Sequence, residues 1–539
     1  MKITLAQINL TIGDFKGNFA AIVSAIEHAQ SEGSELIVFS ELAVCAYPPD
    51  DLLNHKSFVE DCQNVIHYLL PYSKKIAIII GSPTFNAQAE GRQLYNSACV
   101  LQGGHLTHTI HKTLLPTYDV FDESRYFEPN TQFELVKING NQVAITICED
   151  LWFDANDFKY KHNPLSALSA LNPDVVINLS ASPFNQHKQE ERYDTLKRAA
   201  LGFNKPLIYV NQVGAHTDLI FDGRSMVFNA KGEMCWQAKA FDEAIYTVDT
   251  NHISPVEETT INSIEEIYNA LIFGLKDYFQ KNGFKTALLG SSGGIDSAVV
   301  QALLSDAIGA ENVTAVLMPS KYSSEGSVQD AMTLSQQLGN PYFQLPIASI
   351  IDAYDKVLDP LYNGLPIGLA EENIQARTRA NLLMSLSNKF GHILINTSNK
   401  SELSVGYSTL YGDLCGSLSA IGDVYKTQVY ALAQFINSKA NRIPESIIHK
   451  APSAELRPDQ KDSDSLPEYH FLDAILYLHI EKQLGNDEII ALGHDAATVA
   501  KVLNLVKNSE YKRFQAPPVL RVSSKSFGRG RIIPLVKKW

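Results

Sequence analysis

A run of small residues between an apolar strand and an apolar helix is the feature that most constrains the fold of this chain. TALLG (286–290) predicts a buried strand, GSSGGIDS (290–297) a tight loop, and DSAVVQALLSDAIG (296–309) a helix. VTAVLMPS (313–320) predicts the next strand. Strand, loop, helix and strand in this order favour a parallel, doubly wound sheet, because a helix between two strands is the usual crossover between parallel neighbours.

The loop has the composition of a phosphate-binding site. Glycines and serines let backbone N–H groups converge on one point, and the helix that follows places its positive end there. A structural alternative is a tight turn with an N-cap serine, but the position between strand and helix favours the functional interpretation. Asp296 would repel a phosphate directly, so we expect it to bind Mg²⁺. The candidate ATP contacts are Gly290, Ser291, Ser292, Gly293, Gly294, Ile295, Asp296 and Ser297.

Length and composition limit the remaining possibilities. A chain of 539 residues predicts at least two domains. Its formal charge of -14 argues against nucleic acid and anionic membranes as partners. The N-terminal sequence lacks the pattern of a signal peptide, and no apolar run is long enough to span a membrane. The six cysteines show no zinc spacing and are expected to be reduced, so we predict a cytoplasmic protein.

The first half of the chain predicts an α/β domain rich in strands. NFAAIVSAIEHAQSEG (18–33) has the pattern of an amphipathic helix between strands. We assign residues 1–250 to this domain, 251–262 to a polar linker and 263–539 to the second domain. The predicted strands of the first domain are 3–10, 35–42, 75–82, 142–150, 174–182 and 205–214.

Three residues in the first half form a coherent catalytic set. Glu41, Lys112 and Cys148 each follow or end a strand-like run, where sites form in layered α/β proteins. Taken singly, each has an ordinary explanation as a core thiol or a surface charge. Together they supply a nucleophile, a general base and a cation that stabilises the thiolate and the oxyanion.

These segments, FSELAVCAYPPDDL, THTIHKTLLPTYDVFDESRYFEP and ITICEDLW, resemble the nitrilase superfamily. The resemblance implies a four-layer αββα sandwich that acts on a carbon–nitrogen bond, here an amide. Tyr118, Ser182 and Lys188 resemble the glutamine contacts of its glutaminase members. The loop at 290–297, in turn, resembles that of the N-type ATP pyrophosphatases, which cleave ATP to AMP and pyrophosphate.

The two halves together resemble the family of bacterial glutamine-dependent NAD⁺ synthetases. This resemblance implies L-glutamine, ATP and deamido-NAD⁺ as substrates, Mg²⁺ as cofactor, and homo-oligomers formed through the second domain. Free ammonia would be protonated in water, so we expect a shielded path for it between the domains. The resemblance adds Thr397, Lys426 and Ser453 as ATP contacts, Glu402 as a second Mg²⁺ ligand, and Asn373, Arg377, Glu402 and Lys512 as deamido-NAD⁺ contacts, with Arg513 an alternative to Lys512.

Several alternatives stay open at this point. The same architecture fits a glutamine-fed ligase for another carboxylate, a nucleotide sensor, or an amidase with a vestigial second half. The intact loop and the complete Glu41, Lys112 and Cys148 set favour the ligase. The basic segment 511–539, which contains no Asp or Glu, predicts either a solvated arm or a mobile flap that contacts phosphate.

Overall fold

The chain folds into two compact units. In the computed structural model they are Met1–Thr260 (unit 1) and Ile261–Trp539 (unit 2). The structure describes residues 1–88, 90–153, 160–256 and 262–538. The predicted linker, 251–262, overlaps residues 257–261, which lie outside this set. No helix among the described residues combines the length and the apolar character that crossing a lipid bilayer requires.

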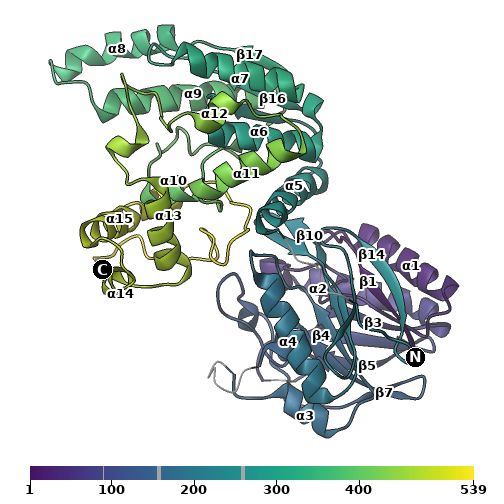
Figure 1. Cartoon of the computed structure of the whole chain (residues 1–539). Coiled ribbons are helices and arrows are strands. Elements are labelled where there is room, and N and C mark those ends of the chain that lie inside the picture. Colours follow the sequence, from purple (N-terminus) through teal and green to yellow (C-terminus); the bar gives the residue numbers. More distant parts are fainter. Residues whose placement is uncertain (89, 154–159, 257–261, 539) are drawn as a thin grey trace. The chain divides into compact units, whose positions relative to one another are not determined.

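Two mixed six-stranded sheets form the centre of unit 1 (Figure 1). The first has the order β14 (Ala244–Asp249), β1 (Lys2–Gln7), β2 (Leu36–Val38), β3 (Ala77–Phe85), β4 (Leu94–Gln102) and β5 (His105–His111). The second has the order β13 (Met234–Gln237), β12 (Met226–Phe228), β9 (Leu207–Asn211), β8 (Val175–Ser180), β7 (Asn141–Ile147) and β6 (Val136–Ile138). A ribbon joins β10 (Val213–His216) to β11 (Leu219–Asp222).

Alternation of buried side chains along the strands explains the layers of unit 1. In β3, Ala77 and Ile79 belong to the core between the two sheets, whereas Ile78 and Ile80 pack on the helical side. Helices cover both outer faces, with α1 and α4 on opposite flanks in Figure 1. The predicted four-layer α/β sandwich is therefore confirmed. Its helices are α1 (Phe15–Ser31), α2 (Lys56–Leu69), α3 (Pro164–Ala170) and α4 (Lys188–Phe203).

Two predicted strands end before their candidate catalytic residues. The strand predicted over 35–42 stops at Val38, and the one predicted over 142–150 stops at Ile147. In each case the chain leaves the sheet and turns its next residues toward the site. Strands β4 and β5 were not predicted, because polar residues interrupt the buried run of β4 and β5 is exposed or half-buried along its length.

A five-stranded, all-parallel sheet forms the centre of unit 2, which confirms the predicted doubly wound fold. Strand β15 precedes the glycine loop and lies between β16 and β18, so the connections leave it in opposite directions. Ligands bind at such switch points in open α/β sheets. The strand order is β17 (Tyr342–Gln344), β16 (Val313–Leu317), β15 (Ala287–Gly290), β18 (Ile393–Asn396) and β19 (Leu418–Ser419).

Helices cover both faces of this sheet. Helices α5 (Ser263–Lys281), α6 (Ile295–Ile308) and α11 (Lys426–Lys439) pack together, and α6 is buried almost all round. Helices α8 (Ala348–Tyr362) and α9 (Leu369–Phe390) share a core with β15, β16 and β18. Helix α7 (Glu325–Leu338) follows β16, and α12 (Glu445–His449) contacts α6 and α11.

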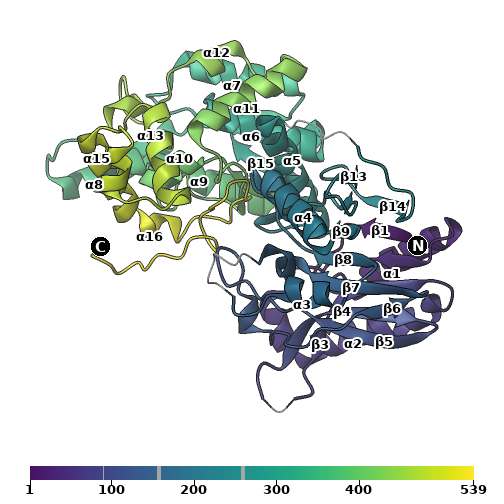
Figure 2. The same ribbon diagram turned by 60° about the horizontal axis from the view of Figure 1, so that its bottom comes forward.

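A separate helical core completes unit 2. Helices α10, α13 and α15 lie together in Figures 1 and 2 and share buried apolar side chains. The end of the chain also packs here, because Val519 and Phe527 belong to this core. Part of the predicted basic tail is thus packed and is not a solvated arm. The helices are α10 (Lys400–Val405), α13 (Tyr469–Leu476), α14 (Asn486–Ala491), α15 (Ala496–Asn508) and α16 (Glu510–Arg513).

Candidate active sites

Strand ends bring the predicted catalytic residues of unit 1 together. Glu41 follows β2, Lys112 follows β5 directly, and Cys148 follows β7 directly. The first two therefore come from one sheet and the third from the other. Cys148 opens the short 3₁₀ turn Cys148–Trp152 with a left-handed φ of 41°, a conformation that non-glycine residues rarely adopt.

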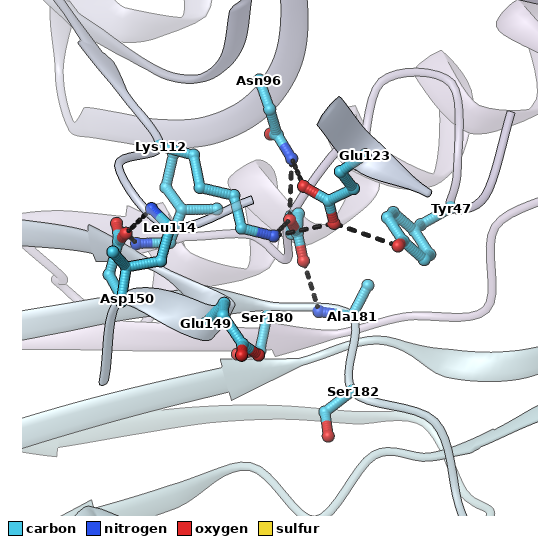
Figure 3. A network of polar contacts seen from close by, with 12 residues as sticks. Tyr47, Asn96, Lys112, Leu114, Glu123, Glu149, Asp150, Ser180, Ala181 and Ser182 are labelled. Atoms are coloured by element: carbon cyan, nitrogen blue, oxygen red, sulfur yellow. Dashed lines mark hydrogen bonds and ion pairs between the residues drawn. The ribbon is translucent and has the colours of Figure 1, made fainter. Parts of the chain in front are cut away.

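Lys112 lies at the centre of a buried ionic cluster. Its Nζ donates to Glu41 Oε1 at 2.7 Å and to Glu123 Oε1 at 2.8 Å (Figure 3). The Lys112 side chain is 0% exposed and the two carboxylates 1% and 5%. Burial lowers the pKa of Lys112, but the charges of Glu123 and Glu41 outweigh burial and raise this pKa well above its ordinary value. Lys112 is therefore a permanent cation.

Both oxygens of Glu41 have fixed partners. Asn96 Nδ2 donates to Oε1 at 2.8 Å, and the backbone N–H of Ala181, directly after β8, donates to Oε2 at 3.1 Å (Figure 3). Glu123 accepts from Lys112 and from the Tyr47 hydroxyl, at 3.0 Å. Burial raises the pKa of Glu123 to about 7 against the opposing charge of Lys112.

The Cys148 side chain is buried close to this cluster. Burial, followed by the charge of Glu41, raises the pKa of Cys148, and Lys112 opposes this shift only in part. The resting nucleophile is therefore a thiol. A resting thiol is consistent with the role expected for Glu41, a general base that removes the thiol proton. The thiol stays protonated because two carboxylates already neutralise the charge of Lys112.

Asp150 joins the two strand ends that carry Lys112 and Cys148. Its Oδ1 accepts from the backbone N–H groups of Thr113 (3.0 Å) and Leu114 (2.8 Å), and its Oδ2 accepts from that of Ile147 (3.0 Å). One carboxylate thus fixes the chain just after Lys112 and just before Cys148. Burial raises the pKa of Asp150 to about 6, although these three N–H groups lower it.

The predicted glutamine contacts lie beside the Cys148–Trp152 turn or next to a partner of Glu41. The Tyr118 hydroxyl donates to Glu149 Oε1 at 2.9 Å, and Lys188 Nζ lies 4.0 Å from the centroid of the Trp152 ring. Ser182 follows Ala181, whose N–H binds Glu41, and the Ser182 N–H donates to Asn211. All three predicted residues therefore border the segment that contains Cys148 or the partner of Glu41.

The glycine loop of unit 2 turns sharply between β15 and α6. Gly293 has a left-handed φ of 76°, and a Cβ at this position would collide with the Ser327 backbone. The Ser297 hydroxyl donates to the Gly294 carbonyl at 3.0 Å. The Ser291 hydroxyl instead donates to Gln301 inside the core, at 3.1 Å, so this predicted phosphate donor is already engaged.

The two predicted Mg²⁺ ligands meet at one lysine. Lys426, at the start of α11, contacts the carboxylates of Asp296 and, at 3.1 Å, Glu402. Asn399 Nδ2 donates to Asp296 Oδ1 at 2.9 Å. Burial raises the pKa of Glu402 to about 8 against the opposing charge of Lys426. Among the described residues no group of three or more His, Cys, Asp or Glu forms a metal cluster.

The predicted deamido-NAD⁺ contacts converge on the segment after α10. Asn373 on α9 accepts from the Thr409 hydroxyl at 2.8 Å, and Arg377, one turn later, donates to the Leu410 carbonyl at 3.2 Å. Lys512 Nζ donates to the carbonyls of Gly406 (2.7 Å) and Ser408 (2.6 Å). The side chains of all three thus contact residues 406–410.

The remaining predicted contacts differ in their surroundings. Arg513 is buried and donates to backbone carbonyls of Leu403 and Ser404 on α10 and to Glu510. Thr397 is half-buried between β18 and α10. It lies two residues before Asn399, which donates to Asp296. Ser453 is exposed on a loop, and its hydroxyl donates to the Gln460 carbonyl at 2.6 Å.

Comparisons with known proteins agree over the whole chain. Residues 2–257 match the carbon-nitrogen hydrolase family, and residues 267–516 match the NAD synthase family. The glutamine-dependent NAD(+) synthetase of Synechocystis sp. is 45% identical over 99% of this chain and 98% of its own length. That of Acinetobacter baylyi is 41% identical over 100% and 98%.

The chain belongs to the glutamine-dependent NAD⁺ synthetase family.

A solved structure supports the fold of this family member. The glutamine-dependent NAD⁺ synthetase of Acinetobacter baumannii, in complex with ADP, has a TM-score of 0.79 and 39% identity, over 99% of this chain and 98% of its own. The family predicted from the two sets of motifs is thus confirmed, and with it the class of glutamine-hydrolysing, ATP-dependent ligases.

The structure adds residues to the site that the motifs did not reveal. Glu123 accepts a hydrogen bond from Lys112, and Asn96 donates one to Glu41. Asp150 aligns the two strand ends that carry Lys112 and Cys148. Glu123 and Asp150 lie within the segments that carry the nitrilase resemblance, yet a single sequence does not show that an acidic residue is buried. Asn96 lies on an unpredicted strand, so no sequence signal pointed to it.

Proposed function

We propose that unit 1 hydrolyses L-glutamine and that unit 2 uses the ammonia, with ATP, to convert deamido-NAD⁺ to NAD⁺. One observation carries this proposal most directly. An ion-paired lysine, a carboxylate and a thiol meet in unit 1, while two carboxylates and a lysine meet beside the glycine loop of unit 2. The first arrangement suits acyl transfer from an amide, and the second suits binding of a nucleoside triphosphate.

Glu41 acts as the base in the glutaminase reaction. It takes the proton of Cys148 as the sulfur attacks the amide carbon of glutamine. Lys112 and a backbone N–H stabilise the oxyanion that forms. The C–N bond then breaks, ammonia leaves with the proton that Glu41 returns, and a glutamyl thioester stays on Cys148. Glu41 next removes a proton from water, and hydrolysis of the thioester releases glutamate.

Opposite charges beside Cys148 support glutamine as the amide. The Glu149 carboxylate, held by the hydroxyls of Tyr118 and Tyr160, is a candidate partner for the α-ammonium group of the amino acid. Lys188 is a candidate partner for the α-carboxylate. Its pKa is lowered by burial, and an anionic ligand would favour its charged form. An uncharged amide would offer neither group a charged partner, which costs affinity.

In unit 2 the nicotinate carboxylate of deamido-NAD⁺ attacks the α-phosphorus of ATP. The bond to the bridging oxygen breaks, pyrophosphate leaves with the electron pair, and an adenylate forms. Ammonia then attacks the activated carbonyl carbon, and AMP leaves as the amide of NAD⁺ is completed. The loop N–H groups and Lys426 neutralise the departing phosphates, while Asn373, Arg377 and Lys512 hold the dinucleotide.

Asp296 and Glu402 fit the demands of Mg²⁺. Both offer hard carboxylate oxygens, and both already converge on the one cation of Lys426. A bound Mg²⁺ would neutralise phosphate charge, as it does in other phosphoryl-transfer sites. Two protein carboxylates are enough, because Mg²⁺ usually completes its shell with water and phosphate oxygens.

We also propose that the protein is a homo-oligomer joined through unit 2. Its support is an exposed apolar stripe on α8 and the loop that follows it. Val357 and Leu361, four residues apart on one face, are 69% and 75% exposed. Leu365 and Ile367 in the loop are each 74% exposed. A cytoplasmic location and a shielded path for ammonia stay predictions.

The proposed division of labour is tested with Cys148→Ala. This variant is expected to lose glutamine-dependent NAD⁺ formation and to keep the ammonia-dependent reaction at the wild-type rate. Cys235→Ala, which removes a thiol of unit 1 outside the site, is the matched control. Both reactions are followed by NAD⁺ production, with circular dichroism to verify folding. Loss of the ammonia-dependent reaction in a folded Cys148→Ala protein would contradict the proposal.

The acceptor is tested separately. Wild-type protein with ATP is expected to release pyrophosphate when deamido-NAD⁺ is added, and not when nicotinic acid or another adenylatable acid replaces it. Faster release with a different acid would identify the protein as a ligase for that acid.

A further inference from the structure

A fully buried ammonium group in unit 2 has no part in the reaction proposed above. Lys400 is the first residue of α10, and its side chain is 0% exposed. Its Nζ lies 3.0 Å from Asp423 Oδ1 and 3.0 Å from Glu481 Oε1. It also donates to the Ser523 hydroxyl at 2.6 Å and to the Lys525 carbonyl at 2.9 Å. These five residues are called the Lys400 cluster below.

The Lys400 cluster ties the end of the chain to α10. Asp423 accepts from the backbone N–H groups of Val522 (2.9 Å) and Ser523 (2.7 Å) and from the Ser523 hydroxyl (2.8 Å). Ser524 donates to Glu481. Arg521 is also buried and donates to the carbonyls of Ser523 and Ser524, so two cations and two carboxylates share this segment. A buried charge is tolerated only when it is paired in this way.

Three neighbours of Lys400 connect α10 to different parts of the ATP site. Asn399 donates to Asp296, and its Oδ1 accepts the N–H of Glu402 at 2.9 Å. The Ser401 hydroxyl accepts the backbone N–H of Lys426 at 2.9 Å and donates to Asp473. Glu402 contacts Lys426 directly. The Lys400 ammonium instead contacts Asp423, Glu481 and the chain end.

We propose that Lys400 is a positioning residue for the adenylation step. The Lys400 cluster fixes the first turn of α10 against the chain end. That helical turn then keeps the Glu402 carboxylate and the Lys426 ammonium in their positions relative to each other. The segment that contains Ser523 and Lys525 is therefore a structural part of the synthetase site. This inference rests on the proposed function of unit 2.

The size of the effect follows from the geometry of the step. The carboxylate oxygen of deamido-NAD⁺ bonds to the α-phosphorus as the bond between that phosphorus and the pyrophosphate oxygen breaks. A displacement of roughly 1 Å in a positioning group costs about 100-fold in rate. Because the partners of Lys400 are not among the residues proposed to bind substrate, its loss is expected to slow the step with little change in ATP binding.

The test replaces the ammonium and restores the charge balance. Lys400→Met keeps most of the side-chain volume, and Glu481→Gln removes the carboxylate that it would leave unpaired. The double variant is expected to release pyrophosphate about 10- to 100-fold more slowly in a single turnover, with the KM for ATP changed by less than about threefold. Glutamine hydrolysis by unit 1 is expected to match that of wild type. Lys389→Met, which removes an exposed lysine of α9, is the matched control.

Each outcome either supports or overturns the positioning role of Lys400. Pyrophosphate release at the wild-type rate in the folded double variant would overturn the inference. If that variant does not fold, Ser523→Ala decides, because it removes one acceptor of Lys400 without changing charge. Slower release from Ser523→Ala with an unchanged melting temperature supports positioning, and an unchanged rate overturns it. No release from wild-type protein would instead contradict the proposed function of unit 2.

Discussion

At the scale of single residues, the glutaminase site depends on how buried charges are paired. Lys112 has two carboxylate partners, Glu41 and Glu123, so the cation is retained although its side chain is fully buried. The same pairing limits what Lys112 does for Cys148. Because two carboxylates offset the charge of Lys112, the buried thiol stays protonated, and Glu41 must then remove the proton during attack.

The protonation state of Cys148 is directly measurable. Because burial and Glu41 raise its pKa, the resting protein is expected to show no thiolate absorbance at 240 nm between pH 6 and 9. The measurement is the difference in absorbance between wild type and Cys148→Ala across this range. A thiolate band that titrates below pH 7 would show that Lys112 does stabilise a resting thiolate.

Asp150 predicts a pH dependence. Only its ionised form accepts all three N–H groups, and its pKa lies at about 6, so glutamine hydrolysis is expected to fall as pH drops through 6. Asp150→Asn is expected to hydrolyse glutamine about 10- to 100-fold more slowly, as when other groups that orient a site are replaced. The side-chain amide of this variant also does not titrate, so the variant should lack the Asp150 part of the acid limb. Rate profiles from pH 5 to 8 test both points.

Protonation of Asp150 is expected to change the free energy of unfolding in the opposite direction to activity. The folded-state pKa of Asp150 exceeds the ordinary value of 3.8, so the folded protein binds this proton more tightly. Its contribution to the free energy of unfolding therefore falls as pH rises from about 4 to 6 and is constant above that. Glu123→Gln separates the second group, whose pKa lies at about 7. An Asp150→Asn profile identical to wild type would exclude Asp150 as the titrating group.

At the scale of elements, the glycine loop between β15 and α6 requires a left-handed backbone at Gly293. Gly293 combines a left-handed φ with close approach to the start of α7. Gly293→Ala is expected to weaken ADP binding at least about 10-fold, because the loop must shift and a left-handed non-glycine residue costs about 1–2 kcal/mol. Isothermal titration measures this effect, and glutamine hydrolysis is expected to be unchanged.

The control for Gly293→Ala has the same backbone conformation. Gly364 has a φ of 78°, and a Cβ there would meet nothing within 4 Å. Gly364→Ala therefore carries the conformational cost without the collision. Equal ADP affinity in the two variants would show that the contact with Ser327 is unimportant.

Element boundaries show the limits of periodicity. Strand β15 and helix α6 were predicted almost to the residue, because their apolar residues are continuous and glycine marks the break. Strands β4 and β5 were missed, although β4 carries Asn96 and β5 leads to Lys112. Buried Asn96 and Ser97 interrupt the apolar run of β4, and β5 is exposed or half-buried, so neither sequence shows a clear alternation.

At the scale of the whole molecule, the exposed stripe on α8 predicts association. Leu361→Lys places a charge where a second copy would have to bury it, so the oligomer is expected to dissociate into smaller species. Size-exclusion chromatography with light scattering measures the mass. Lys356→Ala, an exposed change on the same helix, is the control. A wild-type monomer, or a Leu361→Lys oligomer of unchanged mass, would exclude this surface.

The sequence by itself determined which chemistry the chain carries. Glu41, Cys148 and the loop 290–297 are local signals, since each is a polar or small residue placed where an apolar strand ends, and Lys112 lies in a segment that carries the family resemblance. The tertiary structure decided how those residues behave. Partners from distant segments, such as Glu123 for Lys112 and Lys426 for Asp296, set their charge states. Burial and pairing arise only when strands and helices meet, so a pattern along one chain does not contain them.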